Sequence, residues 1–158
     1  MSLDVERIVN EFKNYDLDPG KIKTEKIFGE LLSLKQTLDL STTAHTRTAN
    51  AFLASLFQVI GYKAGIAHYW ERVLEDALKA KKIEVKVRLR TEGKAFTKEE
   101  LADAIDADLE VVKLAERLSV AAASRFFWDH VMEMLHEISK RVDSASMSLG
   151  VEAKLKGN

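Results

Sequence analysis

Apolar residues recur at three- and four-residue spacing along most of this chain, which is the pattern of helices that bury one face. Two long segments carry the pattern: residues 43–90, which contain no proline, and a last segment that follows Asp108 and ends near Leu149, with Gly150 as a stop. Two long helices joined by a short connection pack as an antiparallel hairpin. The pattern therefore predicts an all-α fold built on a long antiparallel helical hairpin.

Two shorter amphipathic segments precede the hairpin. The first carries its apolar side chains largely on one face, and Thr24 is placed to cap the second. A turn at Pro19-Gly20 separates them. We therefore expect a two-helix N-terminal extension, residues 1–43, followed by the long hairpin, residues 44–158, within a single domain.

The end of the first long helix carries a conflicting signal. Residues 83–90 alternate apolar and polar at period two, the pattern of a half-buried strand, yet nothing else in the chain resembles a strand. Because an isolated strand cannot satisfy its backbone hydrogen bonds, we interpret this segment as the last turns of the helix. Beyond it, Thr97 and Glu100 fit a capping box that opens a short acidic helix, and Asp108 can cap the next.

The apolar surface of the two long helices is broader than a two-helix packing uses. We therefore predict a homo-oligomer whose interface includes the last helix, through five apolar residues at heptad spacing: Trp128, Val131, Leu135, Ile138 and Val142. The alternative is a monomeric four-helix bundle, in which the N-terminal helices cover this surface.

Composition narrows the class of protein. The chain has 158 residues, of which 46% are hydrophobic and 31% charged, which suits one domain with a real core. Cysteine is absent, which excludes disulfide and thiolate chemistry and fits a reducing cytosol.

The charged N-terminus predicts no signal peptide. The uncharged run between Arg47 and Lys63 holds 15 residues, fewer than the roughly 20 that a membrane span needs. We expect a cytoplasmic protein.

One pair of residues raises the question of an enzyme. Glu133 and His136 form an E-x-x-H step on the last helix, of the kind that di-metal carboxylate bundles use twice. The sequence holds no second step of this kind, no glycine-rich phosphate loop and no nucleophile motif. We therefore predict no metal site, no cofactor and no enzymatic activity.

Charge is distributed unevenly around residue 98. Residues 79–98 hold eight cations against two glutamates, a local net charge of +6, and residues 99–116 hold seven acids against one lysine, a local net charge of −6. On a helix the cations form two ridges that suit phosphates, and seven of them are candidate nucleic-acid contacts: Lys79, Lys81, Lys82, Lys86, Arg88, Arg90 and Lys94. The alternative is that the basic and acidic stretches neutralise each other.

The order of these motifs resembles the phage recombination mediator family, the UvsY-like proteins. The resemblance covers residues of about 60–155 and is carried by Lys86-Val87-Arg88-Leu89, preceded by Lys81-Lys82 and followed by "KEELADAIDADLEVVKL" and "FFWDHVMEMLHEISKRVDSAS". Residues 1–43 lie outside it.

The resemblance implies a non-enzymatic accessory protein in the cytoplasm of a phage host. Such proteins form ring-like homo-oligomers, bind single-stranded DNA and help a recombinase displace the single-strand-binding protein. Carried over by position, Lys86 and Arg88 would be the principal phosphate contacts, and Leu89 would pack the helix end. The alternative function is a helical structural or scaffolding protein that binds no nucleic acid.

Overall fold

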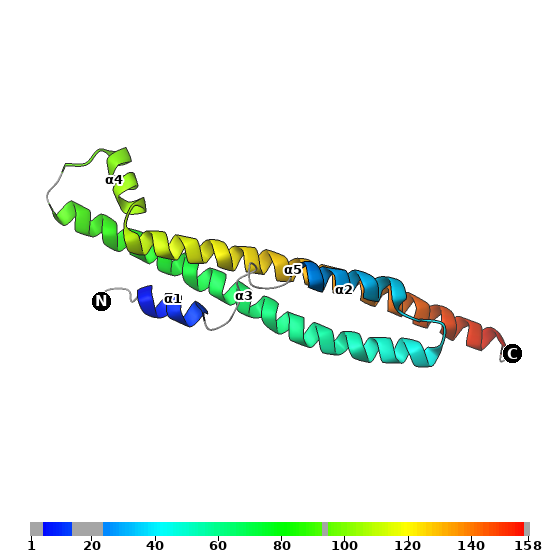
Figure 1. Ribbon diagram of the computed structural model, residues 1–158. Coiled ribbons are helices and arrows are strands. Elements are labelled where there is room, and N and C mark those ends of the chain that lie inside the picture. Colours follow the sequence, from blue (N-terminus) through cyan, green and yellow to red (C-terminus); the bar gives the residue numbers. More distant parts are fainter. Residues whose placement is uncertain (1–4, 14–23, 93–94, 157–158) are drawn as a thin grey trace. The chain divides into compact units, whose positions relative to one another are not determined.

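The computed structural model describes residues 5–13, 24–92 and 95–156, and these residues form helices and connections without any strand. In chain order the helices are α1 (Val5–Lys13), α2 (Thr24–Thr37), α3 (Thr43–Thr91), α4 (Lys98–Asp106) and α5 (Leu109–Lys156) (Figure 1). The all-α prediction and the two long helices are confirmed. The predicted turn at Pro19-Gly20 lies outside the described residues.

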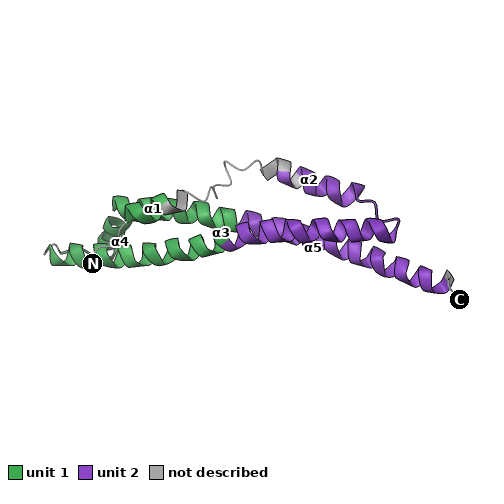
Figure 2. Ribbon diagram, turned by 90° about the horizontal axis from the view of Figure 1, so that it is seen from below, with its two compact units in different colours: residues 1–22, 66–125 green, residues 23–65, 126–158 purple. Residues whose placement is uncertain are grey.

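The helices contribute to two compact units (Figure 2). Unit 1 consists of residues 1–22 and 66–125, and unit 2 of residues 23–65 and 126–158. The division therefore falls within α3 and α5 and differs from the expected boundary after residue 43. Of the two N-terminal helices, α1 belongs to unit 1 and α2 to unit 2.

Unit 1 is built on a core to which three helices contribute. Val5 and Val9 of α1 are buried together with Trp70, Leu74 and Ala77 of α3 and with Leu114 and Ala121 of α5. The spacing of Val5 and Val9 places both side chains on one face of α1, as its amphipathic pattern predicts. The short first helix is thus part of the core of this unit.

Unit 2 buries the five residues that we assigned to an oligomer interface. Trp128, Val131, Leu135, Ile138 and Val142 are at most 7% exposed within the single chain. This position corrects the prediction, because side chains already buried by their own chain offer no surface to another. Helix α2 lies against α5 here: Lys35 Nζ is 2.6 Å from Glu137 Oε2, and the Lys35 carbonyl accepts a hydrogen bond from Arg141. These five residues of the apolar stripe of α5 are therefore covered within the unit, whereas Phe126 and Met147 of the same helix stay exposed.

The segment that alternates at period two is helical. Residues 83–90 form the last turns of α3, where Val85 is buried while Ile83 and Val87 are exposed. The helical interpretation is confirmed. The same helix contains the uncharged run of residues 48–62, which contributes Leu53 and Ile60 to the buried residues. No helix in the described part of the chain has the length and apolarity that crossing a membrane requires.

Helix α5 continues beyond its predicted end. It passes through Gly150 and reaches Lys156, so the prediction that Gly150 stops it is wrong. A glycine ends a helix when its backbone adopts the left-handed conformation. Gly150 does not adopt that conformation, and the helix continues through it.

Candidate nucleic-acid interface

Helix α4 begins with the predicted capping box. The Thr97 hydroxyl accepts from the Glu100 backbone N–H at 3.2 Å, and the Glu100 carboxylate accepts from the Thr97 N–H at 2.8 Å. The bond from the Thr97 backbone lowers the pKa of Glu100, since it stabilises the ionised carboxylate. This reciprocal pair fixes where the chain turns into α4.

Asp108 caps α5, as predicted, and also forms an ion pair. Its Oδ1 accepts from the backbone N–H groups of Glu110 at 3.0 Å and Val111 at 3.3 Å. Its Oδ2 accepts from Arg88 Nη2 at 2.8 Å. Burial raises the pKa of Asp108, but the bonds from Arg88 and the two amides outweigh it and leave that pKa below its usual value.

Three ion pairs connect the end of α3 to the junction between α4 and α5, and we call them the junction ion pairs. They are Lys81–Glu110 at 2.5 Å, Lys82–Asp106 at 2.7 Å and Arg88–Asp108 at 2.8 Å. Each joins a cation of the basic stretch to a carboxylate of the acidic stretch. The two stretches therefore neutralise each other in part, and the junction ion pairs hold the last residue of α4 and the start of α5 beside the end of α3.

Lys81 is the most buried of these cations, with only 2% of its surface exposed. Its ammonium group lies 2.5 Å from Glu110 and 3.0 Å from Glu84. The bond to Glu110 raises the pKa of Lys81 despite the opposing effect of burial. This corrects the expectation that Lys81 contacts nucleic acid, because a buried ammonium group held between two carboxylates cannot reach a phosphate.

The remaining cations of residues 79–98 fall into two groups. Lys79 pairs with Glu75 at 2.7 Å, one helical turn away. Lys86, Arg90 and Lys98 are exposed, and none has a carboxylate within ion-pair distance in the part of the chain that the structure describes. Lys94 lies outside the described residues. The family resemblance implies Lys86 and Arg88 as the principal phosphate contacts. Lys86 has no carboxylate partner among the described residues, whereas Arg88 forms an ion pair with Asp108.

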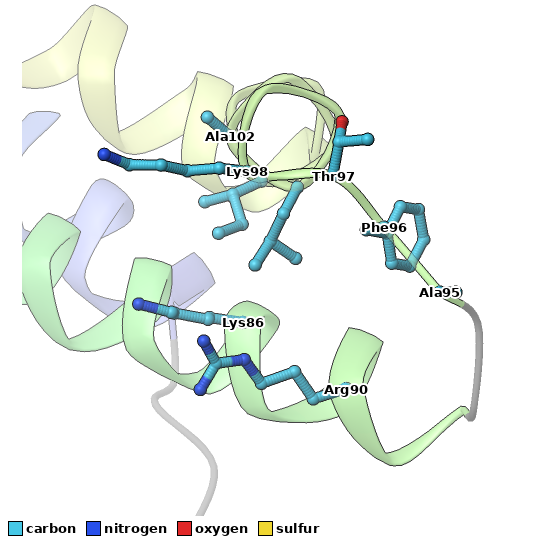
Figure 3. Close-up of a pocket in the computed structure, with 9 residues that line it drawn as sticks. Lys86, Arg90, Ala95, Phe96, Thr97, Lys98 and Ala102 are labelled. Atoms are coloured by element: carbon cyan, nitrogen blue, oxygen red, sulfur yellow. The ribbon is translucent and has the colours of Figure 1, made fainter.

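The three unpaired cations line one open pocket between α3 and α4, with a volume of about 670 Å³. Figure 3 shows Lys86 and Arg90 on α3 and Lys98 at the start of α4, on the opposite side of the pocket. Between the cations the lining is largely apolar: Ala95, Phe96, Leu101, Ala102 and Ile105. The arrangement places positive charge around an apolar surface, which suits a ligand that is both anionic and apolar.

Sequence reasoning missed part of this pocket. It counted Lys98 in the local charge but did not place it at the site, and it did not include Leu101 or Ile105. The available signal was the spacing of Leu101 and Ile105, which puts two apolar side chains on one face of the short acidic helix. That α3 contributes the opposite wall follows from the packing of α3 against α4, which no local pattern specifies.

The E-x-x-H step of α5 has other contacts. Glu133 lies 3.4 Å from His130 Nδ1, and the His136 ring lies 4.9 Å from that of Phe57. Among the described residues no three His, Asp or Glu side chains are grouped so that they could hold a metal ion.

Comparison with known proteins adds no relative. No protein-family model, curated protein sequence or solved structure matches the chain.

Proposed function

We propose that the chain binds single-stranded DNA through Lys86, Arg90 and Lys98 and acts without enzymatic activity. One observation supports this most directly: these three cations have no carboxylate partner among the described residues and surround a single pocket. Four other cations of the basic stretch pair with carboxylates. The unpaired group is therefore the part of the stretch whose charge stays available to an anion.

The chemistry of the three side chains suits a phosphate backbone. Long cationic side chains neutralise phosphates and release condensed counterions, which gives affinity that does not depend on base sequence. Arg90 can also contact two phosphate oxygens at once with its planar guanidinium group. Three such contacts in one subunit would bind weakly, and assembly of several subunits would multiply the affinity.

The resemblance to recombination mediators extends this proposal. On that basis the chain would assemble as a homo-oligomer and help load a recombinase onto DNA covered by a single-strand-binding protein. Because the predicted interface residues are buried, any assembly would use other apolar side chains. Met147, Val151 and Leu155 of α5 are four residues apart and each is at least 57% exposed. These side chains lie on one face and offer such a surface.

The same exposed side chains favour the second candidate, a helical assembly protein without nucleic-acid binding. In that case the unpaired cations would only set the register between subunits. DNA binding separates the two functions, because both predict assembly.

The test is the affinity for a fluorescein-labelled oligo-dT strand at low salt, measured by anisotropy. The double variant Lys86→Glu with Arg90→Glu should bind at least about tenfold more weakly, since phosphate contacts are lost and repulsion is added. The control, Lys140→Glu with Lys154→Glu in unit 2, changes the net charge equally and should bind as the unaltered protein does. Equal loss in both variants would show that only net charge matters, and no binding by the unaltered protein would leave the assembly function.

A further inference from the structure

We propose that the pocket between α3 and α4 holds one base of the bound strand, so that the protein recognises exposed bases in addition to phosphates. This rests on the proposed function. The phosphate contacts alone would use the cations and would leave the apolar lining without a role.

The first observation is that α4 buries none of its residues completely. A short amphipathic helix in a folded protein normally covers its apolar face against a neighbour. Here Leu101 and Ile105 stay half-buried, and both line the pocket instead of closing onto α3. The Lys82–Asp106 pair contacts the last residue of α4, and the other two junction ion pairs hold the connection and the first turn of α5 that follow it.

The second observation is the combination of lining groups. Phe96 is half-buried at the pocket and lies in the connection just before α4 (Figure 3). Its ring gives a flat apolar surface of the type on which single-strand-binding proteins stack bases. Lys86 and Arg90 on one side and Lys98 on the other are placed to hold the phosphates that flank an inserted base (Figure 3).

The volume of the pocket and the charge of its lining limit the ligands that it can bind. A pocket of about 670 Å³ lies within the roughly 300–1,000 Å³ typical of small-ligand sites and has room for a base with its sugar. Three cations without a carboxylate in the lining disfavour neutral and cationic ligands. A base inside a duplex is stacked and paired and would have to be extracted at a cost, so the site should discriminate against double strands.

The experiment compares two labelled strands of equal length, oligo-dT and a strand of abasic deoxyribose phosphates, which have the same backbone charge. Stacking on an aromatic side chain contributes roughly tenfold in affinity per base, and we expect about this preference for oligo-dT. Ala102→Phe should fill the pocket from α4 without removing a cation. It should lower the affinity for oligo-dT to that for the abasic strand and leave the abasic affinity unchanged.

Ala115→Phe is the matched control, because Ala115 is exposed on α5 and does not line the pocket. It should keep the preference for bases, and circular dichroism should show equal helix content in both variants. If the unaltered protein binds both strands equally, in a salt-dependent way, the base pocket is refuted while the proposed function stands. If it binds neither strand, both fail.

Discussion

Arg88 donates a hydrogen bond to Asp108 at 2.8 Å, and the same carboxylate caps the first turn of α5. One contact thus ties the end of α3 to the start of α5 across twenty residues of sequence. Since Lys81 and Lys82 make parallel contacts to Glu110 and Asp106, three of the eight cations of residues 79–98 tie the end of α3 to the segment around the start of α5. The paired and unpaired cations should therefore respond differently to substitution.

Reversing a paired cation should affect stability, and reversing an unpaired one should not. Lys81→Glu buries a third carboxylate between Glu84 and Glu110 and should cost about 3 kcal/mol or more of unfolding free energy. Lys86→Glu changes an exposed side chain with no carboxylate partner among the described residues and should stay within about 0.5 kcal/mol. Urea unfolding followed by circular dichroism measures both. Equal costs would refute the division into paired and unpaired cations.

The Arg88–Asp108 pair should make stability depend on pH in the acid range. The folded-state pKa of Asp108 lies below the usual value of 3.8, so its contribution is complete above that value and is lost as the pH falls through the lower, folded-state pKa. Asp108→Asn keeps a capping side chain but removes the charge. The difference in unfolding free energy between the two proteins should be largest near neutral pH and shrink below about pH 3.8. A difference that stays constant or grows on acidification would contradict this.

Local patterns determine a large part of this fold. The helical periodicity of residues 43–90 outweighs the strand-like alternation of residues 83–90, because a strand there would have no partner. The caps at Thr97 and Asp108 follow from side chains that bond to nearby backbone groups, and such contacts can be read from sequence. The partners of Lys81 and Arg88 could not be read in this way, since they depend on the register between α3 and α5.

The burial of α5 should appear as stability that does not depend on protein concentration. Leu135 is fully buried within unit 2, and Leu135→Ala should cost about 2–5 kcal/mol through lost packing and a cavity. Because the packing lies within one chain, the fall in melting temperature should be the same over a hundredfold range of concentration. If the fall in melting temperature disappeared at high protein concentration, Leu135 would have to lie at an interface between subunits.

The sequence places Trp128, Val131, Leu135, Ile138 and Val142 at heptad spacing, which makes them candidates for an oligomer interface. Their heptad spacing indicates that they pack against helices but does not say to which chain those helices belong. Helix α2 lies against α5, as the contacts of Lys35 with both Glu137 and Arg141 show. More than a hundred residues of sequence separate Lys35 from Arg141, and no pattern on either helix predicts that they meet.

Gly65 should be a weak point of α3. It lies within the helix and is exposed, and apart from its chain neighbours and the adjacent helix backbone no atom lies within 4 Å of the position that an added Cβ would occupy. Alanine loses less backbone entropy on folding, so Gly65→Ala should stabilise the protein by about 0.5–1 kcal/mol. Thermal unfolding measures the gain. Destabilisation would reveal a neighbour at this face, such as another subunit that requires the close approach.

The salt dependence of binding to oligo-dT tests the central claim most directly. Log affinity should fall linearly with log salt, at a slope of about −0.7 per phosphate neutralised on a single strand. Replacing Lys86, Arg90 and Lys98 together with glutamine should reduce the magnitude of that slope by about 2. Replacing Lys79, Lys140 and Lys154 in the same way removes equal charge and should leave the slope nearly unchanged. Equal slopes in the two triple variants would contradict the assignment of DNA binding to the three unpaired cations.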